Sequence, residues 1–149
     1  MNRTDAPRTS SGVPDAPRLR LTLWIGGVYD AILGLSVILA LEPLSHILPV
    51  PFPAEPFYAR MQGVVLCGLA AFYLFPAHDL ERSLRNVAGA IFIRAGGGLY
   101  LAGYAATGKI APFFHVFAWV DITFAALHLW FLRRERGVKF WPLFLRGET

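Results

Sequence analysis

The segment 86–106 constrains the fold of this chain more than any other. It is apolar and about as long as a helix needs to be to cross a bilayer, roughly 20 residues. Yet it contains Arg94 near its middle, followed by three consecutive glycines at 96–98. A charged side chain at the centre of a bilayer costs about 2.5–3.5 kcal/mol on insertion scales. The rest of the chain therefore has to supply partners for Arg94 inside the membrane.

Three further apolar stretches are long enough to span. Of the 149 residues, 55% are hydrophobic and only 16% are charged, whereas a soluble domain is normally about 25% charged. The sequence therefore predicts an all-α integral membrane protein, a four-helix transmembrane bundle that forms one domain over 18–134. The four expected spans cover residues 20–41, 57–75, 86–106 and 112–132.

The distribution of basic residues predicts how the bundle is oriented. They lie before the first span, in the 76–85 connection and after the fourth span, while the other two connections contain a single cation, Lys109. By the positive-inside rule both termini and the 76–85 connection are cytoplasmic. We therefore expect a multi-pass protein of the bacterial cytoplasmic (inner) membrane, N-in and C-in. The net charge of +4 is then a topology signal, and no nucleic-acid partner is expected.

The segments outside the spans differ in character. Residues 1–17 are rich in Pro, Ser, Thr and charge, which predicts a disordered cytoplasmic tail, with a basic recruitment tail as the alternative. The outer loop between the first two spans contains five of the eleven prolines and should be stiff. Residues 135–149 alternate basic and aromatic side chains, which is typical of an interfacial cytoplasmic tail. A docking site for a partner is the alternative there.

Inside its ends, each expected span contains one formal charge: Asp30, Arg60, Arg94 and Asp121. At 1.5 Å per residue, Asp30 and Arg94 both lie about 18 Å from the outer ends of their helices, Asp121 about 13 Å and Arg60 about 6–10 Å. Asp30 and Arg94 are therefore the best-matched pair. Arg60 could stretch inward toward Asp121, and the opposite pairing stays open.

This charge cluster has three interpretations. It could be a structural ion-pair network, a polar pocket that opens to the outside and binds a polar headgroup or an anion, or a route for protons or ions. His128 lies two helical turns from Asp121, and a hydrogen-bonded role within the bundle is favoured. No second ligand for a haem or a metal is evident beside His128, and no metal site is predicted.

Small residues indicate where helices can pack closely in lipid. In the third span, glycines recur every seven residues and form a seam on one face, while Gly97 lies on the opposite face with Arg94. A helix lined by small residues on both sides should be central to the bundle. The glycines assigned to helix packing are Gly34, Gly63, Gly89, Gly96, Gly97 and Gly103.

Several segments together resemble a known architecture: VYDAILGL at 28–35, PFYARMQGVVLCGLAAFYL at 56–74, the glycine-rich third span with its arginine, and the Asp of the fourth span. Over about residues 20–134 the chain is similar to small bacterial four-helix membrane proteins of the DoxX-like and uncharacterised-domain type. The resemblance implies the architecture, and some such proteins look like accessory subunits of membrane redox systems. It transfers no catalytic role.

No Walker, HExxH, CxxC or GxSxG motif is present, and no catalytic residue is assigned. The leading hypothesis is a non-catalytic membrane protein that binds a lipid-like ligand or serves as an accessory subunit. A small oligomeric transporter or proton-coupled carrier that uses Asp30, Arg94 and Asp121 is the second. A lipid- or quinone-modifying enzyme with Asp121 and His128 as acid–base groups is the third.

No cofactor is predicted, although the aromatic side chains would suit a bound lipid or quinone. The expected partners are membrane lipids and a membrane protein or a second copy of the chain.

Overall fold

The computed structural model describes residues 15–48 and 50–148, and in these residues every regular element is a helix. The helices are α1 (Pro17–Leu39), α2 (Leu41–Ile47), α3 (Pro56–His78), α4 (Leu80–Ala106), α5 (Phe114–Arg136) and α6 (Phe140–Arg146). By length and composition α1, α3, α4 and α5 could each cross a membrane. The all-α class with four potential spans is thereby confirmed. Most of the tail expected at 1–17 lies outside the described residues.

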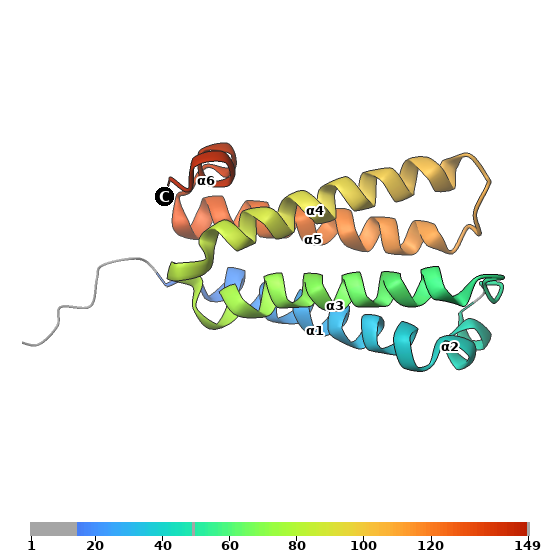
Figure 1. Cartoon of the computed structure of the whole chain (residues 1–149). Coiled ribbons are helices and arrows are strands. Elements are labelled where there is room, and N and C mark those ends of the chain that lie inside the picture. The colour runs from blue at the N-terminus through green and yellow to red at the C-terminus, as the bar shows by residue number, and fades with distance from the viewer. Residues whose placement is uncertain (1–14, 49, 149) are drawn as a thin grey trace, which may run out of the picture.

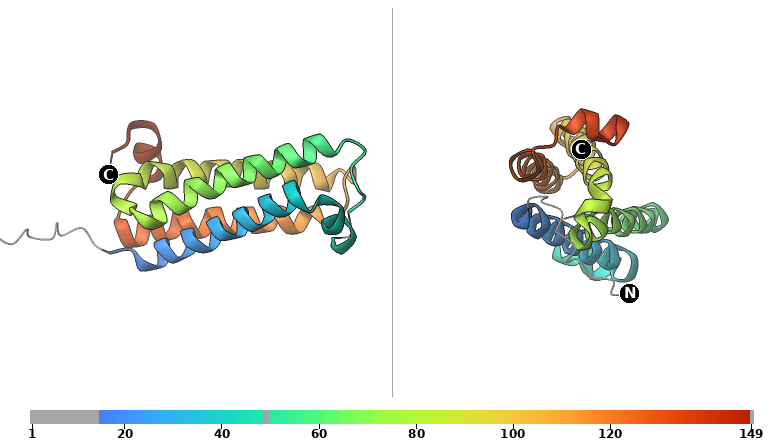
Figure 2. Two further views of the ribbon diagram at one scale, coloured as in Figure 1. Left: turned by 60° about the horizontal axis from the view of Figure 1, so that its bottom comes forward. Right: turned by 90° about the vertical axis from the view of Figure 1, so that its left-hand side faces the viewer.

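The four long helices run side by side as two antiparallel pairs, α1 with α3 and α4 with α5 (Figure 1). The start of α1, the α3–α4 turn and α6 lie at one end of the bundle, which we call the terminal end (Figures 1 and 2). The connection between α4 and α5 and the short helix α2 lie at the other, the loop end. Helix α2 occupies part of the proline-rich connection between α1 and α3.

The helix ends follow from local sequence signals. Pro17 and Pro56 occupy the first turns of α1 and α3, where a missing backbone N–H leaves nothing unsatisfied. Asp79 caps α4 by accepting a hydrogen bond from the backbone N–H of Arg82 at 3.3 Å, and Gly137, with φ 67°, ends α5. Because of the Asp79 cap, α4 begins at Leu80 rather than at residue 86, and its first turns carry the charges expected in a loop.

Helices α1 and α3 approach one another through two glycines. A Cβ atom added to Gly34 would lie 2.7 Å from the carbonyl oxygen of Gly63, and one added to Gly63 would lie 2.7 Å from that of Gly34. Such distances leave no room for any side chain. On α4 the residue in close contact is Gly98, whose added Cβ would lie 3.1 Å from the Ala118 carbonyl oxygen of α5.

The other glycines assigned to packing on α4 do not support close contacts. Additional Cβ atoms on Gly96, Gly97 and Gly103 would meet nothing within 4 Å among the described residues, and one on Gly89 would only touch the Phe72 ring at 3.9 Å. The seven-residue repeat does place Gly89, Gly96 and Gly103 in a stripe, but Gly96 and Gly103 are exposed, and Gly97, outside the repeat, lines the cavity described below. Spacing alone does not give the rotation of a helix about its axis, and here the buried face is the one that carries Arg94 and Gly98.

The described part of the tail, residues 135–148, packs against the bundle more closely than an interfacial tail requires. Helix α5 continues to Arg136, and α6 buries Phe140 and Leu143. Phe144 stacks on Phe92 of α4 with ring centroids 4.9 Å apart. Trp141 remains 59% exposed, so α6 has one face on the bundle and one apolar face directed outward.

The hydrophobic core is concentrated toward the terminal end. Its members come from the beginning of α1, the last turns of α3, the first half of α4, the end of α5, and α6. Ala16, just before α1, and Val138, two residues before α6, complete it. They include Leu19, Leu23, Ala77, Leu84, Val87, Leu132 and Leu143. Beyond this core, toward the loop end, the interior contains the charged residues and then a cavity.

Candidate functional site

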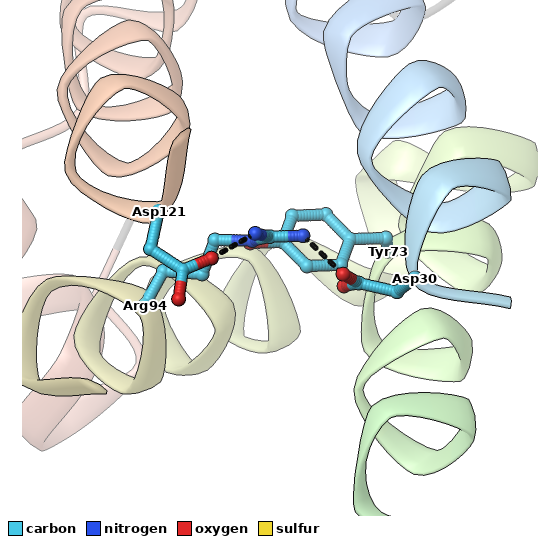
Figure 3. Close-up of polar contacts among 4 residues, drawn as sticks. All are labelled: Asp30, Tyr73, Arg94 and Asp121. Carbon is cyan, nitrogen blue, oxygen red and sulfur yellow. Dashed lines mark hydrogen bonds and ion pairs between the residues drawn. The ribbon is translucent and has the colours of Figure 1, made fainter. Parts of the chain in front are cut away.

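Arg94 is the centre of the candidate site and contacts one residue from each of the other three long helices (Figure 3). Its Nη2 donates to Oδ1 of Asp30 on α1 at 2.6 Å, and its Nε donates to the Tyr73 hydroxyl on α3 at 2.7 Å. Its Nη1 donates to Oδ1 of Asp121 on α5. The side chains of Arg94 and Asp30 are 1% and 0% exposed. One guanidinium group therefore connects all four potential spans.

The sequence around Arg94 explains why Asp121 can reach it. Gly98 lies one turn further along the same face of α4. A Cβ atom at Gly98 would lie 3.0 Å from the Cβ of Asp121 and 2.9 Å from the Ile122 side chain. The absence of a side chain at Gly98 thus lets α5 come close enough for its carboxylate to contact the guanidinium.

Aromatic rings surround the guanidinium group. The Cζ atom of Arg94 lies 4.9 Å from the ring centroid of Phe124, 5.1 Å from that of Tyr73 and 5.8 Å from that of Tyr29. At such distances the ring faces attract a cation, by about 0.5–2 kcal/mol each. The rings also exclude water, which strengthens the ion pairs but makes an unpaired charge here more unfavourable.

The cluster contains two carboxylates and one guanidinium, so its formal net charge is −1 when all three are ionised. Oδ2 of Asp30 is buried and has no hydrogen-bond partner among the described residues. The side chain of Asp121 is 30% exposed. The cluster therefore retains capacity to accept hydrogen bonds on the side that faces away from Arg94.

A cavity of about 870 Å³ begins at these carboxylates and extends to the loop end. Asp30, Asp121 and Tyr29 line its deep end, while Ser45 and Lys109 lie at the loop end. Its walls are mainly apolar and include Leu33, Val37, Leu66, Leu101, Phe114 and Phe117. A space of about 300–1,000 Å³ with apolar walls and a few convergent polar groups is typical of a small-molecule site.

Arg60 is not part of the cluster, in contrast to the expectation that it could reach Asp121. Its side chain is exposed near the start of α3, and no ion pair joins it to Asp121 in the part of the chain that the structure describes. Ala59 and Gln62 of the same helix line the cavity, and a residue one position after Ala59 is rotated by about 100° around the helix. Arg60 therefore points away from the interior, and Arg94 takes its place beside Asp121.

His128 is fully buried, but outside the cavity. It lies between Tyr73 and Phe124, with ring centroids at 5.2 and 5.7 Å. Neither ring nitrogen has a partner in good hydrogen-bond geometry among the described residues; the backbone of Thr22 is the polar group that interacts with the ring. His128 is thus packed between two aromatic side chains, with the Thr22 backbone as its polar neighbour. Within the same residues no group of three or more His, Cys, Asp and Glu side chains is arranged to hold a metal.

The role of Tyr73 as a partner of Arg94 was not predicted from the sequence. Tyr73 lies close to the terminal end of α3. In a symmetric hairpin of α3 and α4, the residue opposite Arg94 would lie roughly nine residues earlier in α3, nearer the loop end. Side chains tilt toward the N-terminus of their own helix, and α3 and α4 are antiparallel. The long side chains of Tyr73 and Arg94 therefore lean toward each other. The directions of the two helices could have predicted this contact.

The fold and the site together define a class: an all-helical chain with four helices that could span a membrane, joined inside by an arginine between two aspartates. In comparisons with known proteins no family model, no curated protein and no solved structure matches the chain. The similarity to DoxX-like proteins accordingly remains a hypothesis based on the residues quoted above.

Proposed function

We propose that this protein is a non-catalytic, multi-pass protein of the bacterial cytoplasmic membrane that binds a lipid-like ligand between its two helix pairs. The observation that carries the proposal is the cavity, whose walls are apolar and whose deep end is formed by Asp30 and Asp121. In the proposed orientation both termini are cytoplasmic, so the terminal end faces the cytoplasm and the loop end faces outward. A ligand would then enter from the outer side.

The shape and chemistry of the cavity suit an amphiphile. Leu33, Leu101 and Phe117 line a long apolar wall that favours a hydrocarbon body, because burial of apolar surface contributes about 25 cal/mol per Å². The carboxylates at the deep end favour a polar group at one tip of that body. A fully polar solute would leave the walls unmatched, and a pure hydrocarbon would leave the carboxylates unsolvated.

The packing on the terminal side of Arg94 supports binding over the alternative of a small transporter. The interior on the terminal side of the cluster is filled by core side chains such as Leu23 and Val87, each 0% exposed. The cavity therefore has access from one side of Arg94 only. A carrier would need a second arrangement of the four helices that breaks the contacts of Arg94 with Asp30 and Asp121.

The remaining alternative, an enzyme that uses Asp121 and His128 as acid–base groups, has less support. Asp121 lines the cavity, whereas His128 is enclosed by Tyr73 and Phe124 and does not line it. A ligand in the cavity would thus contact one member of the pair and not the other. An accessory-subunit role stays compatible with ligand binding, because both use the same rigid bundle.

The proposal can be tested with two matched variants of α4. Leu101→Trp would fill part of the cavity, whereas Leu99→Trp adds the same side chain at a position that is 65% exposed. Native mass spectrometry of protein extracted from its own membrane should show a bound amphiphile in the wild type and in Leu99→Trp, and a loss of most of it in Leu101→Trp. A ligand-free wild type, or equal occupancy in both variants, would refute a binding function for this cavity.

A further inference from the structure

We propose that the cavity selects amphiphiles with a positively charged, hydrogen-bond-donating end, such as a primary alkylammonium, over neutral or anionic ones. This inference rests on the proposed binding function and concerns the chemistry of the deep end. The observation behind it is that the two carboxylates at that end outnumber the single guanidinium between them. It departs from the expectation of a site for an anion.

The charge of the cluster gives the first argument. Asp30, Asp121 and Arg94 leave one negative charge uncompensated in a setting with little water, and isolated buried charge is strongly unfavourable. A monocation at the deep end would bring the sum to zero. An anionic group would bring it to −2 and would find the guanidinium already hydrogen-bonded through Nε, Nη1 and Nη2.

The hydrogen-bonding groups give a second, independent argument. Oδ2 of Asp30 is buried without a partner, and Asp121 exposes part of its carboxylate, while both residues line the cavity. Ionised carboxylates only accept hydrogen bonds. A ligand that offers N–H donors would pair with the exposed part of the Asp121 carboxylate, whereas a carboxylate or phosphate ligand would bring more acceptors to a site that already has too many.

Aromatic side chains add a third contribution. Three aromatic residues are among those that line the cavity: Tyr29, Tyr100 and Phe117. The faces of such rings attract cations, ammonium groups included. The same property is already used inside the cluster, where the rings of Tyr29 and Phe124 lie beside the Arg94 guanidinium.

Lys109 is the one lining residue with positive charge, and its position limits its influence. It lies in the connection before α5 and is exposed, whereas Asp121 lies seven residues inside that helix, about 10 Å along its axis. Interactions of an exposed charge over about 10 Å are largely screened at physiological ionic strength. The deep end therefore determines which head group can be accommodated there.

Three probes that share one hydrocarbon chain test the selectivity: dodecylammonium, dodecanol and dodecanoate. Each is titrated into the purified protein in a neutral detergent, and the bound fraction is counted by native mass spectrometry. We expect dodecylammonium to bind about tenfold or more tightly than dodecanoate, with dodecanol in between. Tighter or equal binding of dodecanoate or dodecanol would overturn the inference while leaving ligand binding intact.

Two variants that each remove one negative charge distinguish the effect of the cluster on binding from the effect of the protein's overall charge. Asp121→Asn changes the deep end, and Glu42→Gln makes the same change at an exposed position of α2 outside the cavity lining. Asp121→Asn should lose most of the preference for dodecylammonium and keep its affinity for dodecanol, whereas Glu42→Gln should match the wild type. An unchanged preference in Asp121→Asn would contradict the inference.

The outcomes also separate this inference from the proposed function. If none of the three probes binds to the wild type, the binding function itself is refuted, and the selectivity falls with it. If Asp121→Asn does not fold, as circular dichroism would reveal, the ranking of the three probes on the wild type still decides the question.

Discussion

The Nη2 atom of Arg94 lies 2.6 Å from Oδ1 of Asp30, a residue 64 positions earlier in the chain and on a different helix pair. The same guanidinium group binds Asp121 of α5 and Tyr73 of α3. Packing between α1–α3 and α4–α5 on the loop side of this group is interrupted by the cavity. Arg94 is thus the main polar connection between the two helix pairs, and the two aspartates that it binds are among the residues that line the space between them.

Removal of Arg94 should destabilise the bundle strongly. Arg94→Leu leaves the carboxylates of Asp30 and Asp121 buried without a counter-charge, and breaking a buried pair in this way typically costs about 3–5 kcal/mol. Thermal or denaturant unfolding in detergent micelles measures the change. Arg60→Leu is the matched control, and its effect should be within about 0.5 kcal/mol because Arg60 is exposed. Equal effects of the two substitutions would refute a central role for Arg94.

The geometry of the guanidinium should matter as well as its charge. Arg94→Lys keeps a cation but replaces the fork of donors that reaches Asp30, Asp121 and Tyr73 by a single ammonium group. We expect a loss of stability between those of the wild type and Arg94→Leu, measured in the same unfolding experiment. A lysine variant as stable as the wild type would mean that the three separate hydrogen bonds contribute little.

Tyr73→Phe removes only the hydroxyl that accepts the Nε hydrogen bond. The buried Nε–H of Arg94 would then lack its partner, for which the expected cost is about 1–3 kcal/mol. Tyr58→Phe, at a ring that is 72% exposed, is the control and should be neutral. If unfolding of the two variants is indistinguishable, Tyr73 packs against Arg94 without bonding to it.

Glycines on α1 and α4 should respond in opposite ways to alanine. Gly34→Ala would place a methyl group 2.7 Å from the Gly63 carbonyl oxygen, so α1 and α3 would have to move apart, at a cost of about 1–3 kcal/mol. Gly96→Ala meets open space among the described residues and should be neutral or stabilise α4 by about 0.5–1 kcal/mol. Destabilisation by Gly96→Ala of the protein in its own membrane, but not in detergent, would instead indicate that a partner covers this face.

Much of the fold could be predicted from the sequence, because four long apolar stretches are signals that each act locally. The pairing of Asp30 with Arg94 was favoured by equal depth, a quantity that requires only the rise per residue. The contact between Asp121 and Arg94 belonged to the alternative pairing that was left open, but the binding of both aspartates by one arginine was not predicted. Depth ignores rotation about the helix axis: Arg60 has a suitable height but the wrong direction. The same rotation decided that Gly98, and not Gly96 or Gly97, packs on α5.

A polar pocket was one interpretation of the charge cluster, but the size and the apolar walls of the cavity could not have been predicted from the sequence. Its walls include Leu, Val and Phe side chains that could equally have filled a core, and α1, α4 and α5 each contribute such residues to both. Whether they meet or stand apart depends on the separation of the two helix pairs. That separation follows from several contacts together, including those of Arg94 with Asp30 and Asp121.

The proposed orientation gives a direct labelling prediction. After Cys67→Ala removes the one native cysteine, Thr107→Cys at the loop end should react with a membrane-impermeant maleimide in intact cells. Glu81→Cys, near the terminal end, should react only after the membrane is permeabilised. The reverse pattern would overturn the assignment of both termini to the cytoplasm.

The central claim is that one arginine binds two aspartates at once, and double-mutant cycles on unfolding stability test it most directly. The cycles combine Arg94→Gln with Asp30→Asn and with Asp121→Asn, and a third cycle combines Arg60→Gln with Asp121→Asn. We predict coupling energies of about 1–3 kcal/mol for both Arg94 pairs and additivity within about 0.5 kcal/mol for Arg60 with Asp121. Additive effects for either Arg94 pair, or coupling between Arg60 and Asp121, would contradict the account.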